Sequence, residues 1–231
     1  ILYSGYAQGT WNMTEAFPAL KQIAENLSVT VGLRYDDYDD VGDTVNPRIG
    51  LVYSPSEKVF FKLLYAQAFR APLFNEMYLR NNPVQIGNAE MKPGTVSTAE
   101  VLAGIRLNRH ITASLNFFSI RKEDTIRLYQ SVWSNQGEIE SKGVEGELRV
   151  SFDKTRYGYF NITYQNVQDV SHEKITDIGG TEYVQDDFNA GMYPKWMANI
   201  GINCDIGRYV NANVSVNYIG SAERIGEMQF T

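Results

Sequence analysis

Residues 210–218 read VNANVSVNY, an unbroken alternation of apolar and polar side chains. The apolar positions are Val210, Ala212, Val214, Val216 and Tyr218, and asparagines or a serine stand between them. Successive side chains of a strand point to opposite faces, so a repeat of two predicts a β-strand. This strand has one apolar face and one polar face.

The same alternation recurs along the rest of the chain. It is clear at 27–36 and 144–152, and weaker at 1–12, 47–54, 58–69, 96–107, 110–128, 157–167 and 195–204. These segments predict ten strands, with at most a turn or two of helix within 15–25. We therefore expect an all-β protein.

The length of the strands favours a membrane barrel over a soluble sandwich. Several segments reach the roughly 9–11 residues that a tilted strand needs to cross a bilayer, whereas soluble strands usually have about five or six. Aromatic residues stand near strand ends, where interfacial girdles lie in such barrels: Tyr3, Trp11, Tyr35, Tyr53, Phe152, Tyr157, Trp196 and Tyr218. The pattern predicts an antiparallel up-and-down transmembrane β-barrel.

Composition excludes several other classes. No apolar run is long enough for a spanning helix, which excludes a helical membrane protein. A net charge of −6 argues against a nucleic-acid partner, whose phosphates need a basic face. No motif indicates a cofactor, and Cys204 is the only cysteine.

Short and long links alternate between the strands. The short ones are 54–57, 108–109, 153–156 and 205–208, and the long ones are 37–46, 70–95, 129–137 and 168–191. Outer-membrane barrels have short periplasmic turns and long outer loops. The alternation therefore predicts that the short links face the periplasm and the long links face the outside of the cell. The fourteen residues of 13–26 fall on the short-turn side and predict an enlarged turn.

Links this short join only adjacent antiparallel strands, so the strands should pair in sequence order as an open sheet. Leu148 should face lipid and Glu147 the lumen. The expected inward positions are small or polar: Ser28, Thr30, Gly32, Asn199, Gly201, Asn211, Asn213 and Ser215. Gly143 is expected to mark a bulge or bend near a strand start.

Five pieces of sequence resemble the barrel of TonB-dependent outer-membrane receptors. They are VTVGLRYDDYDD (29–40), NPRIGLVYSP (46–55), LLYAQAFRAPLFNEMY (63–78), GNAEMKPGTVSTAE (87–100) and NQGEIESKGVEGELRV (135–150). Their order and spacing are specific, and the resemblance covers most of the chain.

The resemblance implies a location in the bacterial outer membrane and a barrel of about 22 strands around an N-terminal plug. It implies a receptor, not an enzyme, that takes up a scarce nutrient such as a ferric siderophore or cobalamin, energised by TonB acting through the plug domain. Its partners would be that small ligand, TonB, and membrane lipid and lipopolysaccharide. With about ten strands, residues 1–231 are expected to be a partial barrel domain without the plug domain and the remaining strands.

Residues 69–72 read FRAP, and we call them the FRAP stretch. Four residues in or near it are candidates for a ligand mouth: Arg70, Glu76, Tyr78 and Arg80. The alternative is that this stretch only ends a strand, because Pro72 lacks an N–H for the ladder. The acidic residues Asp36, Asp37, Asp39, Asp40 and Asp43 offer hard oxygen ligands for calcium, supplemented across loops by Asp186 and Asp187. Their spacing is not that of an EF-hand, so a solvated outer loop is the alternative.

The two histidines, His110 and His172, belong to no cluster with metal-ligand spacing. Haem receptors of the resembled family use a histidine in the loop after the FRAP stretch, and residues 71–88 contain none, so the resemblance disfavours haem as the ligand. Two other functions stay open. A ten-stranded outer-membrane protease would use His172 with Asp169 or Asp177, and a soluble β-sandwich would be a binding protein.

Overall fold

The computed structural model describes residues 2–13, 26–129, 131–170, 173–176, 182–185, 188–189 and 193–222. Ten strands form its main sheet, and all neighbours are antiparallel. They are β1 Leu2–Asn12, β2 Leu27–Tyr38, β3 Gly42–Tyr53, β4 Val59–Arg70, β5 Gly94–Arg106, β6 Ile111–Glu123, β9 Ile139–Ser151, β10 Tyr157–Asp169, β14 Trp196–Ile206 and β15 Val210–Ile219.

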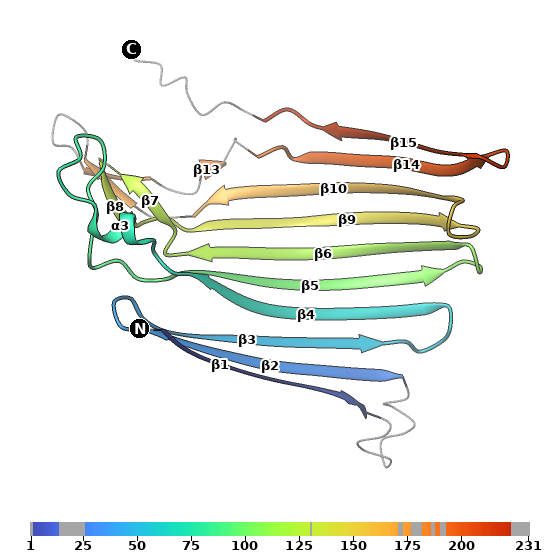
Figure 1. Cartoon of the computed structure of the whole chain (residues 1–231), viewed down its shortest axis with the longest axis horizontal. Helices are drawn as coiled ribbons and strands as arrows, with labels where there is room; N and C mark the ends of the chain where they lie inside the picture. Colours follow the sequence, from blue (N-terminus) through green and yellow to red (C-terminus); the bar gives the residue numbers. More distant parts are fainter. Residues whose placement is uncertain are drawn as a thin grey trace.

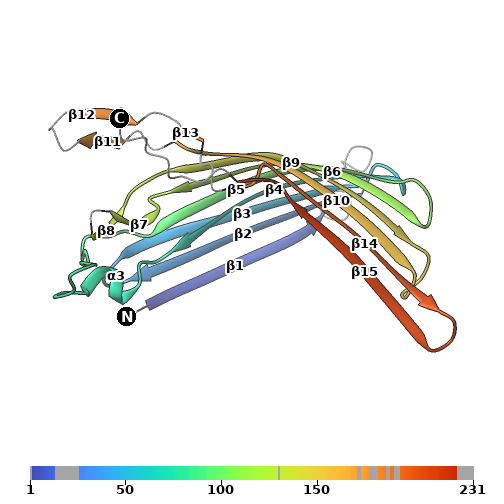
Figure 2. The ribbon, with the colours of Figure 1, turned by 90° about the horizontal axis from the view of Figure 1, so that it is seen from above.

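The strands lie side by side in chain order, from β1 at one edge to β15 at the other (Figure 1). The sheet is curved like part of a cylinder wall (Figure 2). Within the described residues β1 and β15 do not pair, so the curve stays open. The prediction of ten strands in an open, sequentially paired sheet is therefore confirmed.

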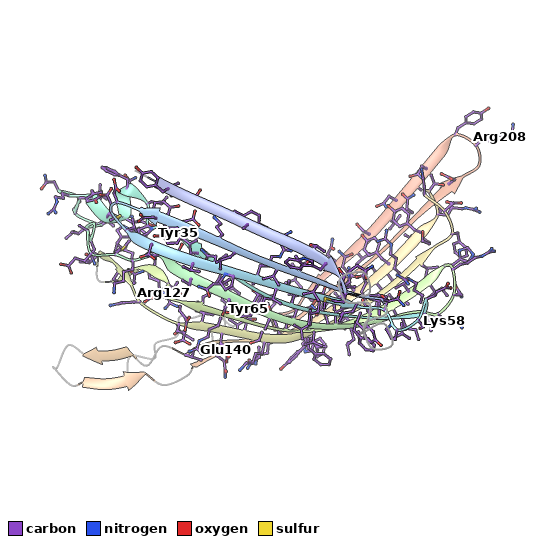
Figure 3. All side chains as sticks on the ribbon, turned by 90° about the horizontal axis from the view of Figure 1, so that it is seen from below. Tyr35, Lys58, Tyr65, Arg127, Glu140 and Arg208 are labelled. Atoms are coloured by element: carbon purple, nitrogen blue, oxygen red, sulfur yellow. The ribbon has the colours of Figure 1, made fainter. Side chains whose placement is uncertain are left out.

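Smaller elements gather where the long links join the ends of the strands, a part of the molecule that we call the loop edge (Figure 1). The helix α3 (Phe74–Tyr78) follows β4, and β7 (Ile126–Tyr129) and β8 (Val132–Asn135) form a hairpin between β6 and β9. A second hairpin pairs β11 (Glu173–Thr176) with β12 (Glu182–Gln185), and β13 (Phe188–Asn189) adds to the end of β10. The opposite edge carries short turns, where Figure 3 labels Lys58 and Arg208.

The strand register separates two faces. Leu148 pairs with Ala113 and Phe160, whereas Glu147 pairs with Ser114 and Asn161. Followed from strand to strand, this register places all eight positions that were expected to point inward on the face of Glu147. That face is polar, and the face of Leu148 is apolar over most of its height.

Burial indicates which face is concave. Buried polar side chains lie on the polar face: Asp36, Thr44, Asn46, Asp169 and Asn203. Large side chains of the apolar face are exposed, among them Val31, Phe117, Ile200 and Val216. Because side chains crowd together inside a curve, we assign the polar face to the concave side.

A single sheet has no second layer to cover it, so it builds almost no core. Among the described residues the buried hydrophobic side chains are Met77, Met91 and Val167. Met77 and Met91 lie in the link between β4 and β5. The apolar outer face therefore needs a partner other than this part of the chain, as expected for a wall that faces lipid.

The prediction of a long link over 37–46 is wrong. β2 continues to Tyr38 and β3 begins at Gly42, with Asp37 opposite Asp43, so the link is three residues long. Gly42 has a φ of +88°, which a glycine adopts without strain and which allows the tight connection.

The predicted strand over 110–128 is also too long. β6 ends at Glu123, and Asp124 has a φ of +51°, a left-handed conformation that breaks the extended chain. The residues that follow form the β7–β8 hairpin instead. The expected turn of helix within 15–25 lies outside the described residues.

Gly143 does not mark a bulge. Its register with Phe118 and with Gln165 is uninterrupted on both sides, and β9 begins four residues earlier, at Ile139. A Cβ at this position would overlap the Phe118 ring and the carbonyl oxygen of Tyr164. Close approach of these groups, and not a bend, explains the glycine.

Two prolines end pairing on strands β3 and β4. β4 ends at Arg70, just before the Ala71-Pro72 dipeptide, as predicted. The β3–β4 ladder stops at Arg48 and Ala66, one residue before Pro47 of β3. Pro47 has no N–H to offer β4, and above it the side-chain amide of Gln67 donates to the carbonyl of Val45 at 3.5 Å.

None of the helices in the described ranges is long and apolar enough to span a membrane.

Candidate functional site at the loop edge

The link between β4 and β5 is organised by a buried carboxylate. Glu76 of α3 is 5% exposed and pairs with Arg70, the last residue of β4, at 2.5 Å. Its second oxygen accepts a hydrogen bond from the backbone N–H of Leu73 at 2.8 Å. Both oxygens of Glu76 are thus used to hold α3 against the end of β4.

The structure separates the four predicted mouth residues into two kinds. Arg70 and Glu76 bind each other, while Tyr78 packs its ring against Phe74 with centroids 5.0 Å apart. Arg80 lies beyond the helix and is exposed. The structure thus joins Arg70 to Glu76, and it leaves Arg80 as the most exposed of the four.

This link is tied to the β7–β8 hairpin by backbone hydrogen bonds. The N–H of Ile86 donates to the carbonyl of Ser131 at 2.7 Å, and the N–H of Trp133 donates to the carbonyl of Ile86 at 3.0 Å. The side chain of Asn135 accepts from the N–H of Lys92 at 2.7 Å and donates to its carbonyl at 2.8 Å. Two chain segments that are distant in sequence therefore form one rim.

The hairpin is also fastened to the sheet. Arg127 of β7 pairs with Asp169 at the end of β10, with 3.0 Å between nitrogen and oxygen. Asp169 is thus held by a cation; its proposed partner His172, and Asp177, the alternative to Asp169, lie outside the described residues. An open pocket of about 460 Å³ lies between the hairpin and the sheet, and Arg70 and Glu76 help to line it.

The acidic run after β2 does not assemble. Asp37 and Asp43 lie opposite each other on neighbouring strands, and Asp39 and Asp40 lie in the turn. Within the described residues, no three acidic, histidine or cysteine side chains form a group that could hold a metal ion. Asp186 and Asp187 fall outside the described residues.

Asp36, counted with the calcium candidates in the sequence, instead binds a neighbouring arginine. It is fully buried, and both of its oxygens accept from Arg34 at 2.7 Å. The Arg34 guanidinium lies 6.0 Å from the centre of the Phe69 ring. This pair lies on the polar face, near the part of β3 before Arg48 that does not pair with β4.

His110 lies at the opposite edge, in the turn between β5 and β6. Its Nε2 accepts from Arg109 at 2.8 Å, and its Nδ1 lies 3.0 Å from the carbonyl oxygen of Ser151. His110 therefore joins two neighbouring turns.

The family model described as "TonB dependent receptor-like, beta-barrel" matches residues 2–228. The chain belongs to this family. TonB-dependent receptors are outer-membrane proteins of bacteria, so the predicted location is confirmed. The match therefore favours this family's barrel over the two alternative folds, the ten-stranded barrel and the soluble sandwich.

Solved structures share the fold of this TonB-dependent receptor barrel. The siderophore receptor PirA of Pseudomonas aeruginosa has a TM-score of 0.69 at 17% identity, over 95% of this chain and 40% of its own. A variant of the ferric enterobactin receptor PfeA from the same organism, in complex with enterobactin, has a TM-score of 0.67 at 17% identity, over 95% of this chain and 32% of its own. The siderophore receptor PirA of Acinetobacter baumannii has a TM-score of 0.64 at 18% identity, over 92% of this chain and 32% of its own.

At these identities the solved structures establish the fold alone. The chain spans about a third of the length of these receptors, 32% to 40% in the three just named. No curated protein sequence matches it closely enough to count as a relative.

Proposed function

We propose that the protein takes up a ferric siderophore across the outer membrane, energised through TonB. The observation that carries this proposal is the two-faced wall, apolar outside and polar inside, in a chain of the TonB-dependent receptor family. The solved structures with the same fold include receptors named for siderophores and for ferric enterobactin, which favours a siderophore over cobalamin.

The polar face supports passage of a bulky polar ligand. Ten strands that curve without closing fit a barrel larger than ten strands, and large barrels leave a lumen that a plug must fill. We propose that this chain is the partial barrel domain of such a receptor, which meets TonB through its plug domain. Lipid and lipopolysaccharide would contact the apolar face.

At the mouth, we propose that Arg80 and Tyr78 contact the ligand directly. Arg80 is exposed beside α3, and a free guanidinium suits the anionic oxygens of iron chelates. Arg70 and Glu76 would act indirectly, because their mutual contact holds α3 in place.

Growth rescue tests this function. The full-length gene is placed in a strain without its own siderophore receptors, under iron limitation, and is supplied with catecholate, hydroxamate or citrate chelates of iron. The proposal predicts rescue by at least one iron chelate, and loss of that rescue when TonB is deleted. Rescue of cobalamin-dependent growth alone, or rescue without TonB, would contradict it.

A matched pair of variants tests the mouth. Arg80→Gln should raise the chelate concentration needed for growth several-fold, because one charge-assisted contact is lost. Arg208→Gln removes the same charge from the short turn at the far end of the sheet (Figure 3) and should leave growth unchanged.

A further inference from the structure

The pocket between the hairpin and the sheet has the size of a small-molecule site. Its volume of about 460 Å³ falls within the roughly 300–1,000 Å³ that such sites occupy. Its lining comes from four stretches of the chain, 69–76, 94–96, 122–126 and residue 133. These stretches belong to β4 and α3, to β5, to β6 and β7, and to β8.

Two of the lining side chains carry polar atoms without partners. The indole Nε1 of Trp133 and the hydroxyl oxygen of Thr125 are buried, and neither has a hydrogen-bond partner among the described residues. An indole N–H can only donate a hydrogen bond, and a hydroxyl can donate one. Buried polar atoms are normally satisfied, so a group that accepts hydrogen bonds is missing from this wall.

Among the described charged side chains that line the pocket, all but one form ion pairs. Arg70 pairs with Glu76, and Glu123 shares Arg121, at 3.3 Å, with Glu138. Lys122 lines the same pocket and has no ion-pair partner within the described residues. The missing acceptor should therefore be negatively charged.

Apart from Thr95, the remaining wall has no polar side chain. Phe69, Val96 and Ile126 contribute a ring and two branched side chains. An inorganic anion would leave this surface uncovered, whereas an anion attached to an apolar body would cover it. We propose that this pocket binds a small carboxylate on an apolar, ring-sized body, with Lys122 as the counter-charge and Trp133 and Thr125 as hydrogen-bond donors.

This site requires neither the siderophore nor TonB. Binding to the purified receptor can be measured without uptake, so failure of the pocket and failure of the proposed function give different results. A receptor that imports iron without binding carboxylates would contradict only the pocket. A receptor that binds carboxylates without importing iron would contradict only the proposed function.

The test uses the full-length receptor in detergent, labelled with 5-fluorotryptophan and observed by ¹⁹F NMR. The signal that disappears in Trp133→Phe identifies Trp133. Titration with benzoate should shift this signal and reach saturation. Benzamide has the same shape without the charge and should bind about tenfold more weakly.

Lys122→Gln should remove the preference for benzoate over benzamide, while Lys154→Gln, in a short turn at the opposite edge, should preserve it. Thr125→Val should weaken both probes, which gives a second variant should Lys122→Gln fold poorly. The proposal is overturned if benzoate leaves the Trp133 signal in place. It is equally overturned if benzoate and benzamide bind alike, or if Lys122→Gln keeps the preference.

Discussion

Asp153 organises the turn between β9 and β10. One of its oxygens accepts from the backbone N–H groups of Thr155 at 3.0 Å and Arg156 at 2.7 Å, and the other accepts from the Arg156 side chain at 2.7 Å. Chiefly through the Arg156 side chain, these contacts lower the pKa of the Asp153 carboxyl to about 2. The folded protein therefore favours the charged carboxylate.

A lowered pKa makes the stability of the folded state depend on pH. The contribution of Asp153 is complete above its ordinary pKa, near pH 4, and is lost as the pH falls towards 2. Asp153→Asn should flatten this part of the pH dependence. Urea unfolding of the full-length receptor in detergent, repeated between about pH 5 and pH 2, measures it. An identical slope in wild type and variant would contradict the assignment.

Gly143 gives a second prediction for a single residue. Gly143→Ala should reduce the free energy of unfolding by about 1–3 kcal/mol, because the new methyl group overlaps Phe118 and the backbone of Tyr164. Gly146→Ala on the same strand is the control, since its Cβ would meet only Ile162, at 3.4 Å. Thermal unfolding followed by gel mobility compares the two. Equal losses would show that close packing at Gly143 is not the reason for the glycine.

Among the strands, β9 tests the assignment of faces. Leu148→Arg should destabilise the receptor by about 2–4 kcal/mol, because it places a charge on the lipid face. Glu147→Arg changes the neighbouring residue on the polar face and should cost much less. Folding yield in lipid vesicles and urea midpoints report the difference. Equal effects would show that the two faces are wrongly assigned.

The link after β4 tests the role of the buried carboxylate. Glu76→Gln weakens the contact with Arg70, and we expect the link to open more readily, by about 1–3 kcal/mol. Glu90→Gln removes an exposed carboxylate from the same link and should have no such effect. Limited proteolysis of the receptor, with the cut sites read by mass spectrometry, measures the opening. Faster cutting in both variants would indicate a general charge effect.

The elements differ in how far the sequence predicts them. The alternation at 210–218 locates β15 to within a residue, because both faces of that strand are uniform. The acidic residues after Tyr35 disfavour a strand by composition, yet Arg34 neutralises Asp36 and pairing with β3 extends β2 to Tyr38. The β7–β8 hairpin has only four residues in each strand, too few for a pattern to show.

The loop-edge site was only partly predictable for a related reason. The FRAP stretch identified Arg70 and Glu76, which are close in sequence and bind each other. The convergence of Lys122, Thr125 and Trp133 on one pocket depends on how the hairpin folds back onto the sheet. Periodicity describes the faces of strands and carries no information about such long-range contacts.

For the whole molecule, the two edges of the sheet should face different compartments. The link between β4 and β5, which includes α3, should face the outside of the cell, and the 152–156 turn should face the periplasm. A protease added to intact cells should cut the first and spare the second. Cutting at 152–156 in intact cells would reverse the orientation.

The central claim is that this chain is a section of barrel wall with lipid on one face and a wet lumen on the other. The direct test places single spin labels at 211–217 of β15 in the full-length receptor, with Cys204 replaced, and measures their accessibility to oxygen and to a water-soluble nickel chelate. We predict strict alternation, with Ala212, Val214 and Val216 accessible to oxygen and the positions between them accessible to the chelate. Equal access of the chelate to both sets would contradict the claim.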